Sequence, residues 1–137
     1  MKTDVKRCAA RGIVGAMAMT GVRSLAAGAG VVDETPPEAV ADEKLRSVSP
    51  RHQDAVVEAV HWLVGAAGGV GYGMLPQAIR RRVWSGPAYG LAMWFGFEKV
   101  IAPALGLSRR HESRPAERAV LAADHALYGL VVRGASS

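Results

Sequence analysis

The amino-acid sequence predicts an all-α fold, a four-helix transmembrane bundle built from two tandem helical hairpins. Three observations predict it: four long apolar stretches follow one another, Gly and Ala fill many of their positions, and two of the stretches repeat one another. Small residues let helix backbones approach closely in a membrane, whereas a soluble core needs bulkier side chains. The 137 residues are assigned to one domain.

The four apolar stretches are helix-like in length. They cover residues 12–32, 55–75, 83–107 and 119–132. A helix that spans the hydrocarbon core needs about 20 predominantly apolar residues. The first three stretches reach that length only with charged residues inside them, and the fourth is shorter. A soluble helical bundle therefore stays open as an alternative.

The first stretch follows a basic amino end formed by Lys2, Lys6 and Arg7. Together with the small residues at 26–30, this start also fits a cleaved secretory signal peptide. Arg23 interrupts the apolar region, which favours a retained membrane helix instead.

A long polar segment, residues 33–53, follows the first stretch. Within it, Thr35 before two prolines is a good helix start. Residues 39–48 then have a weakly apolar side, which suits a short helix on the membrane surface. A solvated acidic loop is the alternative.

The second and fourth stretches carry the internal repeat. Residues 55–65 read AVVEAVHWLVG and residues 119–129 read AVLAADHALYG, with six of the eleven positions identical. The match pairs His61 with His125. A weaker echo relates the first and third stretches, and aligns Gly15, Gly21 and Arg23 with Gly90, Gly96 and Glu98.

The two matches divide the chain into hairpin one, about residues 10–75, and hairpin two, about residues 83–133. Copies with an even number of helices enter the membrane from the same side, which is the parallel-repeat arrangement. Several aromatic side chains are expected to form an interfacial belt. The aromatic residues within or beside the apolar stretches are Trp62, Trp84, Trp94, Tyr72, Tyr89 and Tyr128, of which Trp94 lies too deep for that role.

The net charge of +5 comes from basic residues in short connections, such as Arg80, Arg81 and Arg82. Basic and aromatic residues do not interleave on one face, so nucleic-acid binding is not expected. An orientation with both termini inside the cell agrees with the cluster at 80–82. The lone Cys8 offers neither an intrachain disulfide nor a metal-ligand spacing.

Ionisable residues inside a membrane usually face a partner, a cavity or a pathway. The candidates for a substrate or ion path are Arg23, Glu58, Glu98, Lys99 and Asp124, together with His61 and His125. Arg23 and Glu98 are alternatively expected to form a buried pair that fixes helix packing.

His61 and His125 admit three interpretations. Two imidazoles at equal depth could ligate haem b. With Glu58 and Asp124 they could instead form a metal or proton site. The third interpretation is that both rings form hydrogen bonds across helices.

The glycines are expected to pack helices. Gly65, Gly69 and Gly73 form successive GxxxG spacings for a neighbouring helix or a second subunit, and Gly129 repeats Gly65. No phosphate loop, nucleophile elbow or zinc motif is evident, so no enzymatic activity is expected.

The sequence also resembles the uncharacterised YagU-like bacterial inner-membrane proteins. The residues that carry the resemblance are Tyr89, Gly90, Leu91, Asp124, His125, Tyr128 and Gly129. The resemblance implies a multi-pass location in the bacterial plasma membrane and no known chemistry.

These observations predict a small multi-pass membrane protein in contact with the lipid bilayer. Its expected role is that of a structural or accessory subunit, acting by helix–helix assembly as a homo-oligomer or within a larger complex. A small transporter or proton-conducting protein is the first alternative. A membrane protein that binds haem or a metal ion through His61 and His125 is the second.

Overall fold

The computed structural model describes residues 2–32, 47, 49–104, 106 and 115–134. All elements within these residues are helical, which confirms the predicted all-α class. The long helices are α1 (Lys2–Gly28), α3 (Pro50–Met74), α5 (Ser85–Gly96) and α7 (Pro115–Arg133). The short ones are α4 (Gln77–Arg80), the π-helix η1 (Phe97–Ile101) and α6 (Ala102–Ala104). The helix predicted on the membrane surface lies almost wholly outside the described residues.

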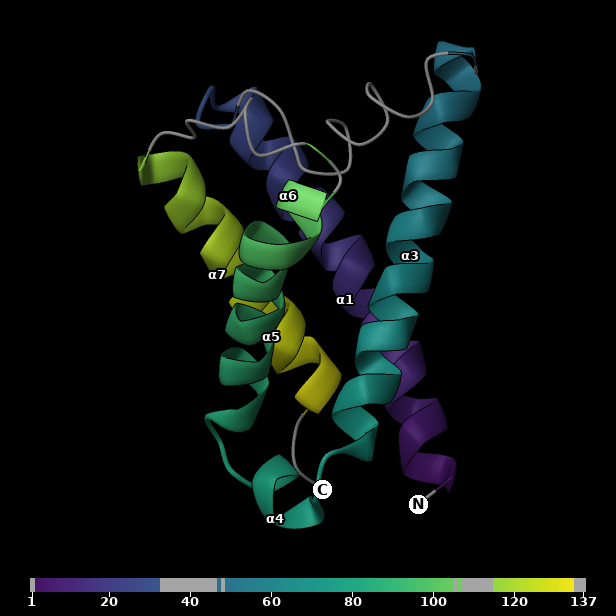
Figure 1. The fold of residues 1–137 in the computed structure, drawn as a ribbon, viewed down its shortest axis with the longest axis vertical. Coiled ribbons are helices and arrows are strands. Elements are labelled where there is room, and N and C mark those ends of the chain that lie inside the picture. The colour runs from purple at the N-terminus through teal and green to yellow at the C-terminus, as the bar shows by residue number, and fades with distance from the viewer. Residues whose placement is uncertain (1, 33–46, 48, 105, 107–114, 135–137) are drawn as a thin grey trace.

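The long helices run alternately up and down the long axis of the molecule (Figure 1). α1 packs most extensively on α3, α5 packs on α7, and α1 also packs along α7. The bundle is therefore ordered α3, α1, α7, α5, with an antiparallel pair on either side of the α1–α7 contact. The start of α1, the whole of α4 and the end of α7 lie at the same end of the molecule (Figure 1).

Proline and glycine set several helix ends. α3 begins with Pro50, whose missing N–H has no partner to lose in the first turn. It ends before Leu75, which is extended with ψ of 147° because Pro76 follows it. α1 ends at Gly28, and Gly30 then adopts a φ of 69°, which favours glycine.

Each predicted apolar stretch falls on a long helix, but the predicted start of the first one is wrong. α1 begins at Lys2 rather than near residue 12, because its basic first turns pack against the end of α3. The third stretch, predicted as one helix over 83–107, is an uninterrupted helical run from Ser85 to Ala104, in which the π-helical turn η1 separates α5 from α6. A π-helical turn holds an extra residue, so the side chains beyond it point in different directions from those of a continuous α-helix.

Glycines bring α1 and α3 into backbone contact. A Cβ atom on Gly12 would collide with the carbonyl of Gly65, and one on Gly69 would collide with the carbonyl of Cys8. Gly73 faces α1 one turn further on. The predicted seam of Gly65, Gly69 and Gly73 therefore lies inside the first hairpin, against a helix of the same chain.

The second hairpin has a matching seam. A Cβ atom on Gly129 would collide with the carbonyl of Gly86, and Gly90 faces the backbone of α7 one turn further on. Gly86 thus contacts Gly129 as Gly12 contacts Gly65. The two helix pairs use the same kind of close glycine contact at corresponding positions of the repeat.

The predicted alignment of the first and third stretches is shifted by one residue from the register that the helix contacts show. It aligned Gly15 with Gly90, but these glycines have different neighbours. A Cβ atom on Gly15 would lie 2.8 Å from the ring of Tyr128, whereas one on Gly90 would collide with the carbonyl of His125. The contacts pair Gly12 with Gly86 instead, because close packing and not residue identity fixes the register.

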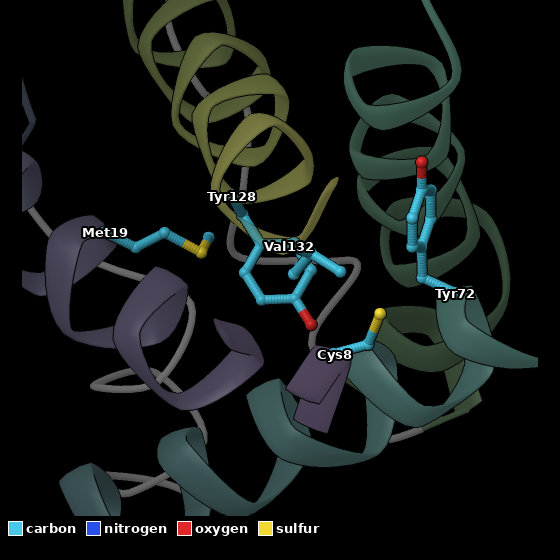
Figure 2. Packing of buried hydrophobic residues seen from close by; sticks show 5 residues of the cluster. All are labelled: Cys8, Met19, Tyr72, Tyr128 and Val132. Atoms are coloured by element: carbon cyan, nitrogen blue, oxygen red, sulfur yellow. The ribbon is translucent and has the colours of Figure 1, made fainter. Parts of the chain in front are cut away.

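Tyrosines join the two hairpins. Tyr128 of α7 donates a hydrogen bond from its hydroxyl to the carbonyl of Gly65 at 2.6 Å. Tyr89 of α5 donates one to the carbonyl of Gly68 at 2.8 Å. Glycine carbonyls accept these bonds because no side chain shields them on that face. Figure 2 shows Tyr128 beside Met19, in the buried cluster that also includes Cys8, Tyr72 and Val132.

The predicted aromatic belt is wrong for two of its members. Tyr72 and Tyr128 are only 2% and 1% exposed, because their rings fill the space that the small residues leave between helices. Tyr72 also packs edge-on against Tyr89, with ring centroids 5.3 Å apart. Trp62 and Trp84 do lie at the surface.

Large apolar side chains cover the outside of the bundle. They come from every long helix: Val14, Met17, Leu25, Val56, Val60, Leu63, Val64, Met74, Leu91, Phe95 and Leu130. Among the described helices, none combines the length and the apolar character needed to cross a membrane. The predicted transmembrane spans are therefore not supported by the helices taken one at a time.

Candidate functional site

Polar side chains from three helices gather inside the bundle, and we call them the polar cluster. Arg23 and Asp124 are buried, and the other members are partly buried. The polar cluster consists of Thr20 and Arg23 of α1, Glu58 and His61 of α3, and Asp124 and His125 of α7. The α7 residues lie within electrostatic reach of Arg23 and His61. Five of the sequence-predicted site residues thus lie together where the two hairpins meet.

Arg23 and His61 form the contact between α1 and α3. The guanidinium of Arg23 donates to Nδ1 of His61 at 3.1 Å and to the hydroxyl of Thr20 at 3.3 Å. An arginine can only donate, so Nδ1 of His61 must be the acceptor. The ring of His61 is therefore neutral in this arrangement and carries its proton on Nε2.

Glu58 is held from two sides. It accepts a hydrogen bond from Thr20 at 3.0 Å and one from the indole nitrogen of Trp62, a turn away on α3, at 2.6 Å. These bonds turn the carboxylate towards α1 and keep it in the polar cluster. Thr20 thus joins Glu58 to Arg23 through one hydroxyl group.

Asp124 is the most enclosed carboxyl group in the described residues. It is 1% exposed, and neither of its oxygens has a hydrogen-bond partner. A buried carboxylate without hydrogen bonds is expensive to keep ionised. Asp124 therefore differs from Glu58, whose charge two donors compensate.

His125 does not form the predicted hydrogen bond across helices. Its Nδ1 donates to the carbonyl of Leu121 on its own helix at 2.8 Å, because a carbonyl can only accept. Nε2 of the neutral ring is left as an acceptor. His61 and His125 occupy matching positions of the repeat yet present opposite hydrogen-bonding groups.

Glu98 and Lys99 lie outside the polar cluster. Glu98 pairs with Arg118 at 3.0 Å, so the predicted Arg23–Glu98 pair is wrong. Arg118 in turn lies 6.0 Å from the ring centre of Trp94. Lys99 is exposed. Both predicted path residues belong to η1, where the π-helical turn directs side chains differently from an α-helix.

The two histidines do not fit bis-imidazole ligation of haem as they stand. His125 has the usual arrangement of an axial ligand, with Nδ1 bonded to a carbonyl and Nε2 available. His61 has the opposite arrangement, because Nδ1 accepts from Arg23 and Nε2 keeps the proton. Within the described residues, no three or more His, Cys, Asp or Glu side chains are grouped to hold a metal ion.

Sequence reasoning missed two contributors to the site. Thr20 links Glu58 to Arg23, but one threonine in an apolar stretch carries no distinctive pattern. Tyr128 bonds α7 to α3, although the sequence pointed to a place at the membrane interface. Its position next to Gly129 in the repeat was the available signal.

Comparison with protein-family models, curated protein sequences and solved structures yields no match to this chain.

Proposed function

We propose that the chain is a membrane-embedded helical bundle that serves as a structural or accessory subunit rather than as an enzyme. The observation that carries the proposal is the distribution of side chains. Large apolar groups face outwards on every long helix, while charged groups such as Arg23, Glu117 and Asp124 are buried. A water-soluble domain normally has the reverse distribution.

The outward apolar groups favour lipid over a protein partner. Leu25, Leu63 and Met74 are 77%, 70% and 73% exposed. Leu25 belongs to α1, whereas Leu63 lies in the middle of α3 and Met74 at its end. A single protein partner covers one face of a molecule, whereas lipid surrounds all of them. Exposed apolar surface of this extent is rare on a soluble monomer.

The assembled bundle, and not the single helix, is the unit that we place in the bilayer. Each helix taken alone contains many glycines and alanines and has charged residues along it. Inside the bundle Arg23 and Glu58 have polar partners, which lowers the cost of holding them away from water.

Membrane extraction tests this proposal. Cells that express the full chain are fractionated, and the pellet is washed with alkaline carbonate and then with a neutral detergent. We expect the protein to stay in the pellet through carbonate and to enter solution with detergent. Release by carbonate, or recovery in the soluble fraction, would contradict the proposal.

A second candidate function, proton transfer, is favoured by the surroundings of Asp124. A buried carboxyl group with two unpaired oxygens can take a proton on one oxygen and lose it again without breaking a hydrogen bond. Arg23 is the charged group that acts on Asp124 from α1. His125, its neighbour on α7, lies within electrostatic reach of His61 and Glu98.

Vesicle assays test the second candidate. The purified protein is reconstituted into vesicles that contain a pH-sensitive dye, and a proton gradient is applied. We expect Asp124→Asn, which cannot take up a proton, to reduce flux to the protein-free level, while Lys99→Gln, outside the polar cluster, leaves it unchanged. Equal flux in wild type and Asp124→Asn would rule this candidate out.

A further inference from the structure

Basic side chains from three distant parts of the sequence meet at one end of the bundle, which we call the basic end. It contains the start of α1, the α4 segment and the end of α7 (Figure 1). Its basic residues are Lys6, Arg7, Arg11, Arg80, Arg81, Arg82 and Arg133. Asp4 is the one acidic residue among the described residues there.

Backbone carbonyls hold several of these guanidinium groups in place. Arg11 donates to the carbonyl of Arg133 at 2.9 Å, and Arg133 donates to the carbonyl of Arg82 at 3.1 Å. A carbonyl orients a guanidinium but does not neutralise its charge. Asp4 approaches Arg80 at 3.7 Å. The basic end therefore carries a clear excess of positive charge.

Apolar side chains border the basic end. Met74 closes α3, Ile79 lies within α4, and Val83 and Trp84 precede α5, and all four are exposed. Arg80, Arg81 and Arg82 lie between them in the sequence. Arginine beside exposed tryptophan and aliphatic groups is typical of the boundary between lipid headgroups and acyl chains.

We infer that the basic end binds the phosphate groups of anionic lipids in one leaflet and so fixes the bundle with both termini on that side. The inference rests on the proposed membrane location. Basic residues that adjoin an apolar surface are attracted to anionic leaflets, and each contributes about 1 kcal/mol. Phosphates of the leaflet would offset the repulsion among arginines such as Arg11 and Arg133, whose charges the backbone carbonyls orient without neutralising.

A lipid titration tests the inference. The full chain is purified in a neutral detergent and titrated with phosphatidylglycerol, phosphatidylcholine or inorganic phosphate, and binding is followed by tryptophan fluorescence. We expect saturable binding of phosphatidylglycerol alone. The exposed pair Arg81→Gln/Arg82→Gln should raise the midpoint about 30-fold, since two contributions of about 1 kcal/mol are lost.

Lys99→Gln is the matched control, because Lys99 is exposed and belongs to η1. This turn leads directly into α6, which lies far from α4 of the basic end (Figure 1). It should leave the midpoint unchanged. Equal binding of both lipids, an unchanged midpoint in the double variant, or an equal effect of Lys99→Gln would overturn the inference. If inorganic phosphate saturated the protein at the same concentration as phosphatidylglycerol, the basic end would be a site for free phosphate and not for lipid.

The carbonate wash and the lipid titration fail separately. If the protein stays in the membrane but does not distinguish the two lipids, the inferred binding of anionic lipid by the basic end is refuted. The proposed membrane location is then unaffected. Release by carbonate refutes the membrane location whatever lipid the purified protein prefers.

Discussion

Asp124 and His61 show how neighbouring polar residues can have opposite surroundings. His61 has a donor from Arg23 on its Nδ1 atom, whereas both oxygens of Asp124 lack a hydrogen-bond partner. The difference follows from position, because His61 faces the polar side chains of α1 while Asp124 lies among closely packed helices. Hydrogen bonding is thus satisfied at Nδ1 of His61 and absent at both oxygens of Asp124.

Asp124→Asn should not destabilise the bundle. Asparagine has nearly the same shape and carries no charge, so it removes the cost of ionising a buried group, while its amide gains no hydrogen-bond partner that the carboxyl group lacks. We expect the midpoint of thermal unfolding in detergent to stay the same or to rise. A marked fall would mean that Asp124 has a hydrogen-bond partner in the folded protein.

Tyr128→Phe should destabilise the bundle by about 1 kcal/mol, because it removes the hydrogen bond to the carbonyl of Gly65 and leaves the ring in place. Thermal unfolding in the same detergent measures the loss. Arg81→Gln, at an exposed residue, is the control and should have no comparable effect. Equal stability of Tyr128→Phe and wild type would show that the bond between the hairpins contributes nothing.

The sequence predicted five of the six residues of the polar cluster, because charged residues within apolar stretches stand out. It could not predict the partners. The Arg23–Glu98 pair was expected from an alignment that the packing does not follow, and Glu98 pairs with Arg118 instead. The hydrogen-bond direction at His61 depends on Arg23 of another helix, whereas His125 bonds to Leu121 of its own helix, and residue identity alone does not specify which of these occurs.

At the scale of the helices, close glycine contacts define the two hairpins. α1 and α3 meet through Gly12, Gly65 and Gly69, and α5 and α7 meet through Gly86 and Gly129. Contacts of this kind bring backbones together and gain dispersion attraction along the whole seam. Because these glycines already contact a helix of the same chain, the glycine seams are not surfaces for a second subunit.

Gly69→Ala should destabilise the bundle by about 1–3 kcal/mol, the usual cost of overpacking, because the new methyl group would collide with the backbone of α1. Gly21→Ala is the matched control, since a Cβ atom at Gly21 meets nothing within 4 Å. Alanine favours the helix, so this control should gain up to about 1 kcal/mol. The measurement is the midpoint of thermal unfolding of both variants in the same detergent. Equal shifts of this midpoint would contradict the close contact of Gly69 with α1.

Helix positions were largely predictable, because apolar stretches and the flanking prolines and glycines mark them. The π-helix η1 was not predictable, since no residue pattern in Phe97–Ile101 distinguishes a π-helical turn from an α-helical one. The start of α1 at Lys2 was missed for a related reason. Its basic first turns are helical because α3 packs against them, and hydrophobicity alone does not reveal that contact.

The whole molecule combines a small buried apolar core, the polar cluster, exposed apolar side chains and the basic end. Small residues allow this combination, because they bring four helices close enough for tyrosines and a polar cluster to fill the interior. The larger apolar side chains are then directed outwards. The sequence predicted the helical pairs, and the structure confirms the helices. The sequence also predicted a membrane location, which we propose from the exposed apolar side chains.

The behaviour of the full chain in alkaline carbonate tests the central claim most directly. A bundle whose apolar exterior faces lipid should stay in the membrane pellet after the wash and leave it only when a neutral detergent is added. Complete release of the protein into the carbonate supernatant would show that the exterior is not buried in lipid, and the proposed membrane location would then be wrong.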